Sequence, residues 1–298
     1  MRLHLVDGTY ELFRAHFSPR PARVAPDGSD VKGTVGLAES LLALLRDPTE
    51  AVTHVAVAFD NPIRSFRNDL LAGYKGDEGV PPELRAQFDL AEEVSRALGL
   101  VTWSMREHEA DDALATAAAR FRDGVEQVRI LSPDKDLGQC LTGTRVVQVD
   151  RVRGRVIEEA TLRERRGIAP RSVPDWLALV GDVADGIPGL PGFGEKAASA
   201  LLSRHPRLED VPPDPGRWPA EVRGASRLCS TLRQRWDEAL LYRWLATLVT
   251  DVPLGESLAD LEWGGVSRRR FDELCDRLGA GRLREAALRR TTRWAAGG

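Results

Sequence analysis

Short apolar runs alternate with longer amphipathic stretches through the first half of this 298-residue chain. The runs are rich in Val, Ile, Leu and Ala, as is typical of strands buried on both faces. They lie at residues 3–7, 53–60, 99–103, 128–132 and 145–149. Between them, apolar positions recur at helical spacing in residues 36–45, 84–98 and 110–121. This alternation predicts an α/β fold with a mainly parallel sheet flanked by helices.

The pattern changes from about Ala169 onward, where helical spacing dominates and no strand is expected. Helices are predicted at residues 173–181, 195–203, 225–247 and 267–278. A Pro/Gly/Asp-rich stretch at 211–219 indicates an exposed connector. We therefore expect two domains, an α/β domain over residues 1–168 and a mostly helical region over residues 169–298.

Acidic residues follow several of the predicted strands. Asp7 and Asp60 end two of them, and Asp134 comes shortly after a third. The carboxyl ends of parallel strands meet at one edge, where such sheets bind ligands. A single aspartate after a strand is most often a turn residue or a helix cap, but three are harder to explain that way.

Further acids accompany these three in compact groups, one of which places two carboxylates three residues apart and so on one helix face. The candidate metal ligands are Asp7, Asp60, Glu109, Asp111, Asp112, Asp134, Asp136, Asp182 and Asp185. Clustered carboxylates repel one another unless they protonate, move apart or bind cations. Oxygen ligands favour Mg²⁺ or Mn²⁺, and none of the five histidines has metal-ligand spacing. Two such ions suit phosphodiester hydrolysis.

The charge balance agrees with a nucleic-acid partner once its distribution is considered. The net charge is −3, and 38 of the 42 basic residues are arginine. If nine acids are neutralised by metal, the remainder carries about +6 and can present a basic face to phosphate. Three cysteines without close spacing give no disulfide scaffold. No apolar run is long enough to cross a membrane, and we expect a cytoplasmic protein.

A glycine-rich turn between two predicted helices points to the substrate class. Gly189, Gly192 and Gly194 precede an alanine-rich helix, and Lys196 adds a positive charge at its start. Backbone N–H groups at such a turn can bind phosphate oxygens. A plain helix connection is the alternative, but the spacing favours a helix–hairpin–helix that grips the nucleic-acid backbone.

These motifs, in this order, resemble the 5′-nuclease (flap endonuclease) superfamily, and in particular the 5′→3′ exonuclease domain of bacterial family A DNA polymerases and its free-standing relatives. The resemblance runs from about residue 3 to residue 283. Its motifs are LVDG at 5–8, FD at 59–60, SFR at 65–67, YK at 74–75, EADD at 109–112, DKDL at 134–137, GDVADGIPGLPGFGEK at 181–196 and LATLVTDVPL at 245–254.

The resemblance implies a PIN-like nuclease domain followed by a helix–three-turn–helix region. It implies that the nine acids bind two or more Mg²⁺ or Mn²⁺ ions in two groups, and that backbone carbonyls of the 186–194 turn hold a K⁺. Lys75 and Arg67 match family positions with a catalytic role, Lys75 near the scissile phosphate. Tyr74 matches a base-stacking position and Arg14 a DNA-binding one. One departure is Glu78, which stands where the family usually has arginine.

The predicted function is therefore that of a free-standing, metal-dependent 5′ nuclease, an exonuclease and flap endonuclease that leaves 5′-phosphate ends in DNA replication and repair. Its expected substrates are DNA flaps, nicks, 5′ ends and RNA primers, and it is expected to act as a monomer. The alternative is a junction-binding protein that has lost catalysis. A PIN-type ribonuclease is a weaker third reading, since those chains are short and lack the hairpin.

Overall fold

The computed structural model describes residues 1–289, which divide into two compact units that interleave along the chain. The first, here called the sheet unit, comprises Met1–Ser65, Asp77–Ser132 and the chain from Thr250 onward. The second, here called the helical unit, comprises Phe66–Gly76 and Pro133–Val249. No helix among the described residues is long and apolar enough to cross a membrane.

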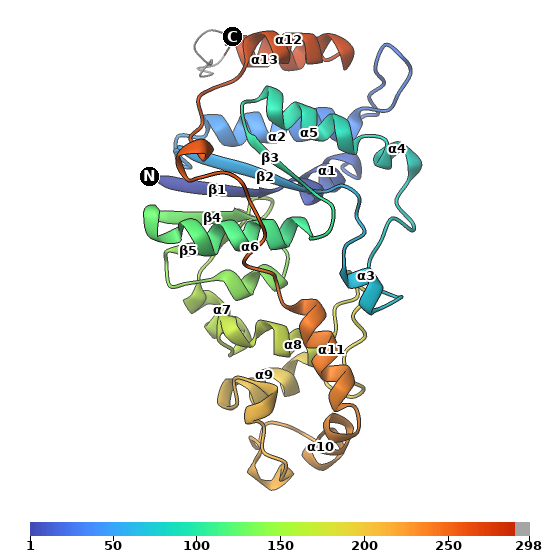
Figure 1. Ribbon diagram of the computed structural model, residues 1–298, viewed down its shortest axis with the longest axis vertical. Coiled ribbons are helices and arrows are strands. Elements are labelled where there is room, and N and C mark those ends of the chain that lie inside the picture. The colour runs from blue at the N-terminus through green and yellow to red at the C-terminus, as the bar shows by residue number, and fades with distance from the viewer. Residues whose placement is uncertain (290–298) are drawn as a thin grey trace. The chain divides into compact units, whose positions relative to one another are not determined.

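Four parallel strands form the centre of the sheet unit (Figure 1). They lie side by side in the order β3 (Val101–Met105), β2 (His54–Asp60), β1 (Arg2–Asp7) and β4 (Gln127–Leu131). Every residue of β2 is buried, as expected for a strand whose two faces are both covered. The predicted parallel sheet is confirmed, and each of these strands begins and ends within two residues of its predicted position.

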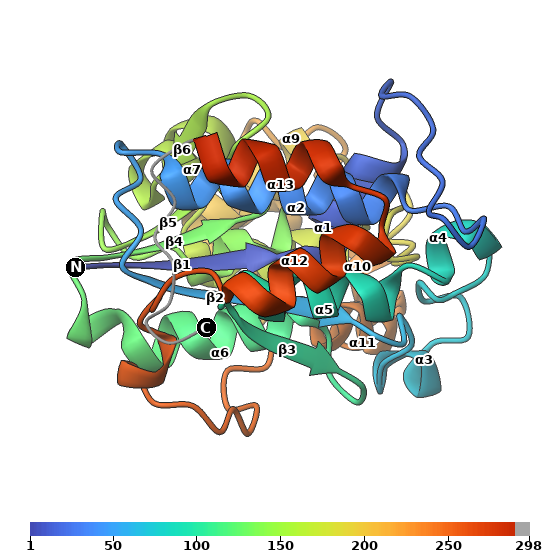
Figure 2. The same cartoon turned by 90° about the horizontal axis from the view of Figure 1, so that it is seen from above.

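Helices cover both faces of this sheet. On one face lie α1 (Gly8–His16), α2 (Lys32–Arg46) and α5 (Phe88–Ala97), and on the other lies α6 (Ala110–Phe121) (Figure 1). Viewed from above, α12 (Arg268–Arg277) and α13 (Gly281–Arg289) form an outer layer over α5 and α2 (Figure 2). This is the flanked α/β arrangement that the sequence predicts.

One predicted helix of this unit is interrupted. Residues 84–98 divide into the short α4 (Pro82–Arg85) and α5, with Gln87 between them. Gln87 is buried, and its side-chain oxygen accepts the backbone N–H of Thr34 at 3.0 Å, in the first turn of α2. Since α2 has no side-chain cap of its own, Gln87 supplies the missing acceptor from elsewhere in the chain.

The helical unit contains one hairpin of strands and a set of helices. Its predicted strand at 145–149 is observed as β5 (Val146–Asp150), which pairs antiparallel with an unpredicted short strand, β6 (Arg155–Ile157). The helices are α3 (Arg67–Leu70), α7 (Glu159–Arg166), α8 (Val173–Val180), α9 (Glu195–Arg204), α10 (Ala225–Gln234) and α11 (Trp236–Ala246). The single helix predicted over 225–247 is thus two, divided at Arg235. The predicted connector 211–219 is exposed only at residues 213–214 and 216–217, whereas Pro212, Trp218 and Pro219 are buried. The indole N–H of Trp218 donates to Pro212 O.

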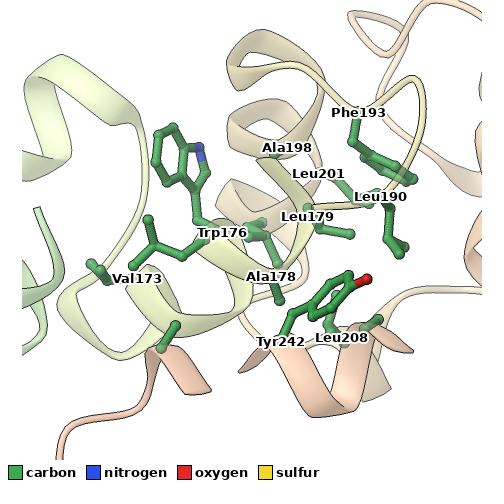
Figure 3. Close-up of a cluster of buried hydrophobic side chains, with 14 of the residues drawn as sticks. Val173, Trp176, Ala178, Leu179, Leu190, Phe193, Ala198, Leu201, Leu208 and Tyr242 are labelled. Atoms are coloured by element: carbon green, nitrogen blue, oxygen red, sulfur yellow. The ribbon is translucent and has the colours of Figure 1, made fainter. Parts of the chain in front are cut away.

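A hydrophobic cluster holds α8, α9 and α11 together (Figure 3). Trp176 and Leu179 of α8 pack with Leu201 of α9 and Tyr242 of α11. The Trp176 indole N–H donates to Ser199 Oγ at 3.1 Å, so the buried polar atom of the ring is satisfied. Because α8 and α9 are fixed against each other, the turn between them has a rigid support.

Candidate active site

Within the sheet unit, carboxylates gather where the parallel strands end. Asp7 is the last residue of β1: its Oδ1 accepts the Tyr10 N–H at 2.8 Å, and its Oδ2 accepts the hydroxyl of Ser132 at 2.9 Å. Asp60 is the last residue of β2, and its Oδ1 accepts the N–H of Ala110 at 2.7 Å. That bond brings the N-terminus of α6 to the edge of the sheet where Asp60 lies.

The start of α6 adds three carboxylates there. Glu109 is the N-cap residue, and its Oε1 accepts the hydroxyl of Ser65 at 2.6 Å. Asp112 accepts the backbone N–H of Glu109 at 2.9 Å, which completes a capping box. Glu109, Asp111 and Asp112 are all buried, and the helix dipole favours negative charge at this end. Asp112 is fully buried, and its bond to the Glu109 N–H shapes the turn that carries Glu109 and Asp111.

The helical unit holds a second acidic group. Carboxylate oxygens of Asp134 and Asp136 lie within 4.8 Å of each other. Burial raises the pKa of Asp136 well above its ordinary value, and the neighbouring charges of Asp134 and Asp185 raise it further, with Lys75 opposing them. Like charges crowded in a buried place are unfavourable without a counter-charge, so this pair is suited to a bound cation.

Two lysines pair with Asp185 and Asp182, the other two predicted metal ligands of the helical unit. Lys75 Nζ lies 2.9 Å from Asp185 Oδ1, and the Lys75 backbone N–H donates to Asp185 O at 3.0 Å. Lys135 Nζ lies 2.8 Å from Asp182 Oδ2, while Asp182 Oδ1 accepts the N–H of Ala184. The helical unit therefore brings Lys75 together with Asp134, Asp136 and Asp185, and it pairs Asp182 with Lys135.

Three other predicted residues make contacts of a structural kind. Arg67 is 1% exposed, and its guanidinium donates to Leu245 O at 2.8 Å and Thr247 O at 3.0 Å, at the end of α11. Tyr74 is buried in the hydrophobic cluster of the helical unit. Arg14 pairs with Glu11 and donates to Ser40 Oγ. The roles that the resemblance implies for Arg67, Tyr74 and Arg14 stay predictions.

The glycine-rich turn joins α8 to α9 through several tight backbone approaches. Gly189 has a φ of +70°, and a Cβ there would lie 2.5 Å from the backbone of Val180 and Gly181. Gly192 also has a left-handed φ, +88°. Gly194 differs, because its φ is −106° and a Cβ would meet nothing within 4 Å. Lys196 is exposed in the first turn of α9.

Adding a side chain is expected to have different effects at these glycines. Gly189→Ala is expected to lower the free energy of unfolding by about 2 kcal/mol, because the methyl group collides with backbone at a strained φ. Gly194→Val is expected to change stability by less than about 0.5 kcal/mol and to weaken duplex DNA binding, because the branched side chain keeps phosphate away from the turn. Urea unfolding and fluorescence anisotropy measure the two quantities; equal loss of stability in both variants would contradict this assignment.

Sequence reasoning missed the groups that orient the acids. Ser132 and Ser65 each donate a hydroxyl to a buried carboxylate, and Lys135 pairs with Asp182. Each lies inside or beside a motif already recognised for its acids or arginine, and that proximity was the available signal.

Both parts of the chain match models of known protein families. A 5′-3′ exonuclease N-terminal resolvase-like domain matches residues 2–167, and a 5′-3′ exonuclease C-terminal SAM fold matches residues 168–269. The chain is 34% identical over 282 residues to DNA polymerase I of Bacillus caldotenax, covering 93% of this chain and 31% of that protein. It is 31% identical over 266 residues to a 5′-3′ exonuclease of Bacillus subtilis strain 168, covering 87% of each.

A solved structure shares the fold. The bacteriophage T5 D15 flap endonuclease, in a pseudo-enzyme-product complex with DNA and metal ions, aligns with a TM-score of 0.64 and 18% identity over 94% of this chain and 100% of that chain. The present chain spans about a third of the length of the DNA polymerase I relatives that it matches.

The matches to the two 5′-3′ exonuclease domains define a class, that of hydrolytic nucleases. The matches to both family domains, and to the Bacillus subtilis exonuclease along most of both chains, place it further. The chain belongs to the 5′-3′ exonuclease family.

Proposed function

We propose that this protein is a structure-specific 5′ nuclease that removes nucleotides from 5′ ends and cleaves 5′ flaps of DNA, including RNA primers, and leaves 5′-phosphate ends. The observation that carries the proposal is the pair of half-buried Asp134 and buried Asp136 beside Lys75, which combines clustered carboxylates with a cation, as phosphodiester hydrolysis needs. DNA replication and repair are the processes that such a substrate preference serves.

Divalent metal use follows from the donors. The nine acids offer only carboxylate oxygens, which fit Mg²⁺ or Mn²⁺, two or more ions in all. When bound, such ions supply Lewis-acid stabilisation and a nucleophile at neutral pH. Asp7, Asp60, Glu109, Asp111 and Asp112 would serve from the sheet unit. Asp134, Asp136, Asp182 and Asp185 would serve from the helical unit.

The chain's own groups position the substrate. We infer that Lys75 offsets negative charge that develops on the scissile phosphate. The position of its ammonium among carboxylates rather than in open solvent supports this role. Backbone N–H groups of the 186–194 turn would hold the duplex phosphates, and carbonyls of the same turn would hold a K⁺. Arg14, Tyr74 and Lys196 remain the proposed further DNA contacts. A monomer located in the cytoplasm also remains our expectation.

A labelled 5′-flap assay tests the proposal. The protein is incubated with flap, nicked and single-stranded RNA substrates in Mg²⁺, in Mn²⁺ and in chelator. We expect metal-dependent products at the flap junction and none in chelator. Junction binding without any product would favour the non-catalytic alternative, and cleavage of single-stranded RNA alone would favour a ribonuclease.

Lys75→Ala is expected to lower kcat on a flap substrate by about 100-fold with less than about a threefold change in junction affinity. The reason is that its charge acts on the reacting phosphate rather than on the duplex. Lys75→Arg, which keeps the charge, serves as the control and should recover part of the rate. Single-turnover cleavage and anisotropy measure the two effects; a large affinity loss at unchanged kcat would refute the role.

A further inference from the structure

The two lysine–aspartate pairs of the helical unit differ in how firmly each lysine is held. Lys75 has a side chain 22% exposed, is bonded through its backbone N–H to the Asp185 carbonyl, and has its ammonium 5.8 Å from the centre of the Tyr74 ring. Lys135 has a side chain 47% exposed, and its ammonium is bonded to Asp182. The Lys75 side chain is therefore more enclosed than the Lys135 side chain, which is nearly half exposed.

Asp182 is in the opposite situation. It is 4% exposed, its Oδ2 is bonded to Lys135 Nζ at 2.8 Å, and its Oδ1 accepts the N–H of Ala184 at 3.0 Å. The loss of its counter-charge strongly destabilises a buried carboxylate. The Lys135 backbone is the N-cap of a short 3-10 turn, so the start of its flexible side chain is fixed while the ammonium can turn toward solvent.

We propose that Lys135 is a displaceable counter-ion of Asp182. In the metal-free protein its ammonium holds the carboxylate, and a divalent ion that binds Asp182 must first displace it. Lys135 therefore sets the concentration of divalent ion that is needed to bind at Asp182, whereas Lys75 stays paired with Asp185. The inference rests on the proposed use of divalent metal.

The test compares single-charge removals without DNA present. Lys135→Met is expected to tighten Mn²⁺ binding at one site by about three- to tenfold, the scale of a partly exposed ion pair. Lys32→Met changes the net charge equally but removes a lysine of the sheet unit whose ammonium donates to Ser18 O, so it controls for long-range charge. Lys135→Arg keeps the positive charge and should bind Mn²⁺ as the wild type does.

Isothermal titration calorimetry gives the affinities, and electron paramagnetic resonance of free Mn²⁺ counts the ions bound. The Lys135→Met protein is also expected to melt lower than the wild type in chelator and to gain more from added Mn²⁺, because Asp182 has then lost the ammonium that is bonded to it. In an Asp182→Asn background, Lys135→Met should no longer change the Mn²⁺ affinity.

Unchanged or weaker Mn²⁺ binding by Lys135→Met would overturn the inference. So would an equal gain in Lys32→Met, or a gain that persists in the Asp182→Asn background. The flap assay separates this result from the proposed function. If the wild type cleaves the flap and Lys135→Met leaves Mn²⁺ affinity unchanged, only the counter-ion role is refuted. If the wild type does not cleave and Lys135→Met still tightens Mn²⁺ binding, only the proposed nuclease activity is refuted.

Discussion

Asp136→Asn is expected to lower flap cleavage by about a thousandfold, the scale lost when a charge-bearing group is taken out of an active site, and to make the metal-free protein more stable. The two effects share one cause. Burial and the charges of Asp134 and Asp185 raise the pKa of Asp136 well above its ordinary 3.8, so its ionised form is unfavourable without a cation. Asparagine removes the charge and, with it, the ability to hold an ion.

The raised pKa of Asp136 also determines how the stability of the metal-free protein changes with pH. Between pH 3.8 and the raised pKa of Asp136, the folded chain keeps a proton that the unfolded chain has released. The contribution of this group to the stability of the metal-free protein therefore falls as pH rises through that window. We expect the difference in urea midpoint between Asp136→Asn and the wild type to grow with pH over this range, and to shrink when Mn²⁺ is added to the wild type.

Asp150→Asn is a matched control whose expected effect on stability is opposite to that of Asp136→Asn. Burial would raise the pKa of Asp150, but hydrogen bonds and the charge of Arg153 outweigh it and lower the pKa. The substitution should therefore lower stability near neutral pH and leave cleavage unchanged. If Asp136→Asn behaved like Asp150→Asn in both measurements, Asp136 would have no place in the cation-binding group.

Arg67→Ala is expected to lower the free energy of unfolding by about 3 kcal/mol, because two charge-assisted hydrogen bonds are lost and a cavity is left behind. Arg67 is 1% exposed and fixes the carbonyls of Leu245 and Thr247. Urea unfolding measures the loss. Arg67→Lys should recover only part of it, because an ammonium cannot reproduce the planar fork of donors.

The same variant separates a structural role from a catalytic one. If Arg67 acts through the fold, kcat per folded molecule at low temperature should remain within about threefold of the wild type. A protein of unchanged stability with a large loss of kcat would instead support the catalytic role that the resemblance implies for Arg67.

The parallel strands could be predicted because their sequences are short apolar runs that only a doubly covered sheet accommodates. β2 is buried at every position and was predicted to within one residue at each end. β6 was not predictable, because Arg155-Val-Ile is short and mostly exposed and exists only through its pairing with β5. The division at Arg235 likewise depends on packing, since the residues on both sides are good helix formers.

The site divides in the same way. Asp7 and Asp60 were recognisable from the strands that they end, and the pairing of strand ends with carboxylates is a local property of the sequence. The burial of Tyr74 was not, because the ring packs with residues far along the chain. The Lys135–Asp182 pair joins positions 47 residues apart, and no spacing rule relates them.

At Gly186 the backbones of two distant segments meet with no side chain between them: a Cβ there would lie 2.0 Å from Gly73 O. The backbone just before Lys75 therefore cannot change in evolution independently of the loop that carries Asp182 and Asp185. An insertion before Lys75, or a larger residue at position 186, would separate the lysine from both acids. Variation among relatives should accordingly accumulate after Lys75, where the sequence runs into Gly76-Asp-Glu-Gly, and spare the residues on its other side.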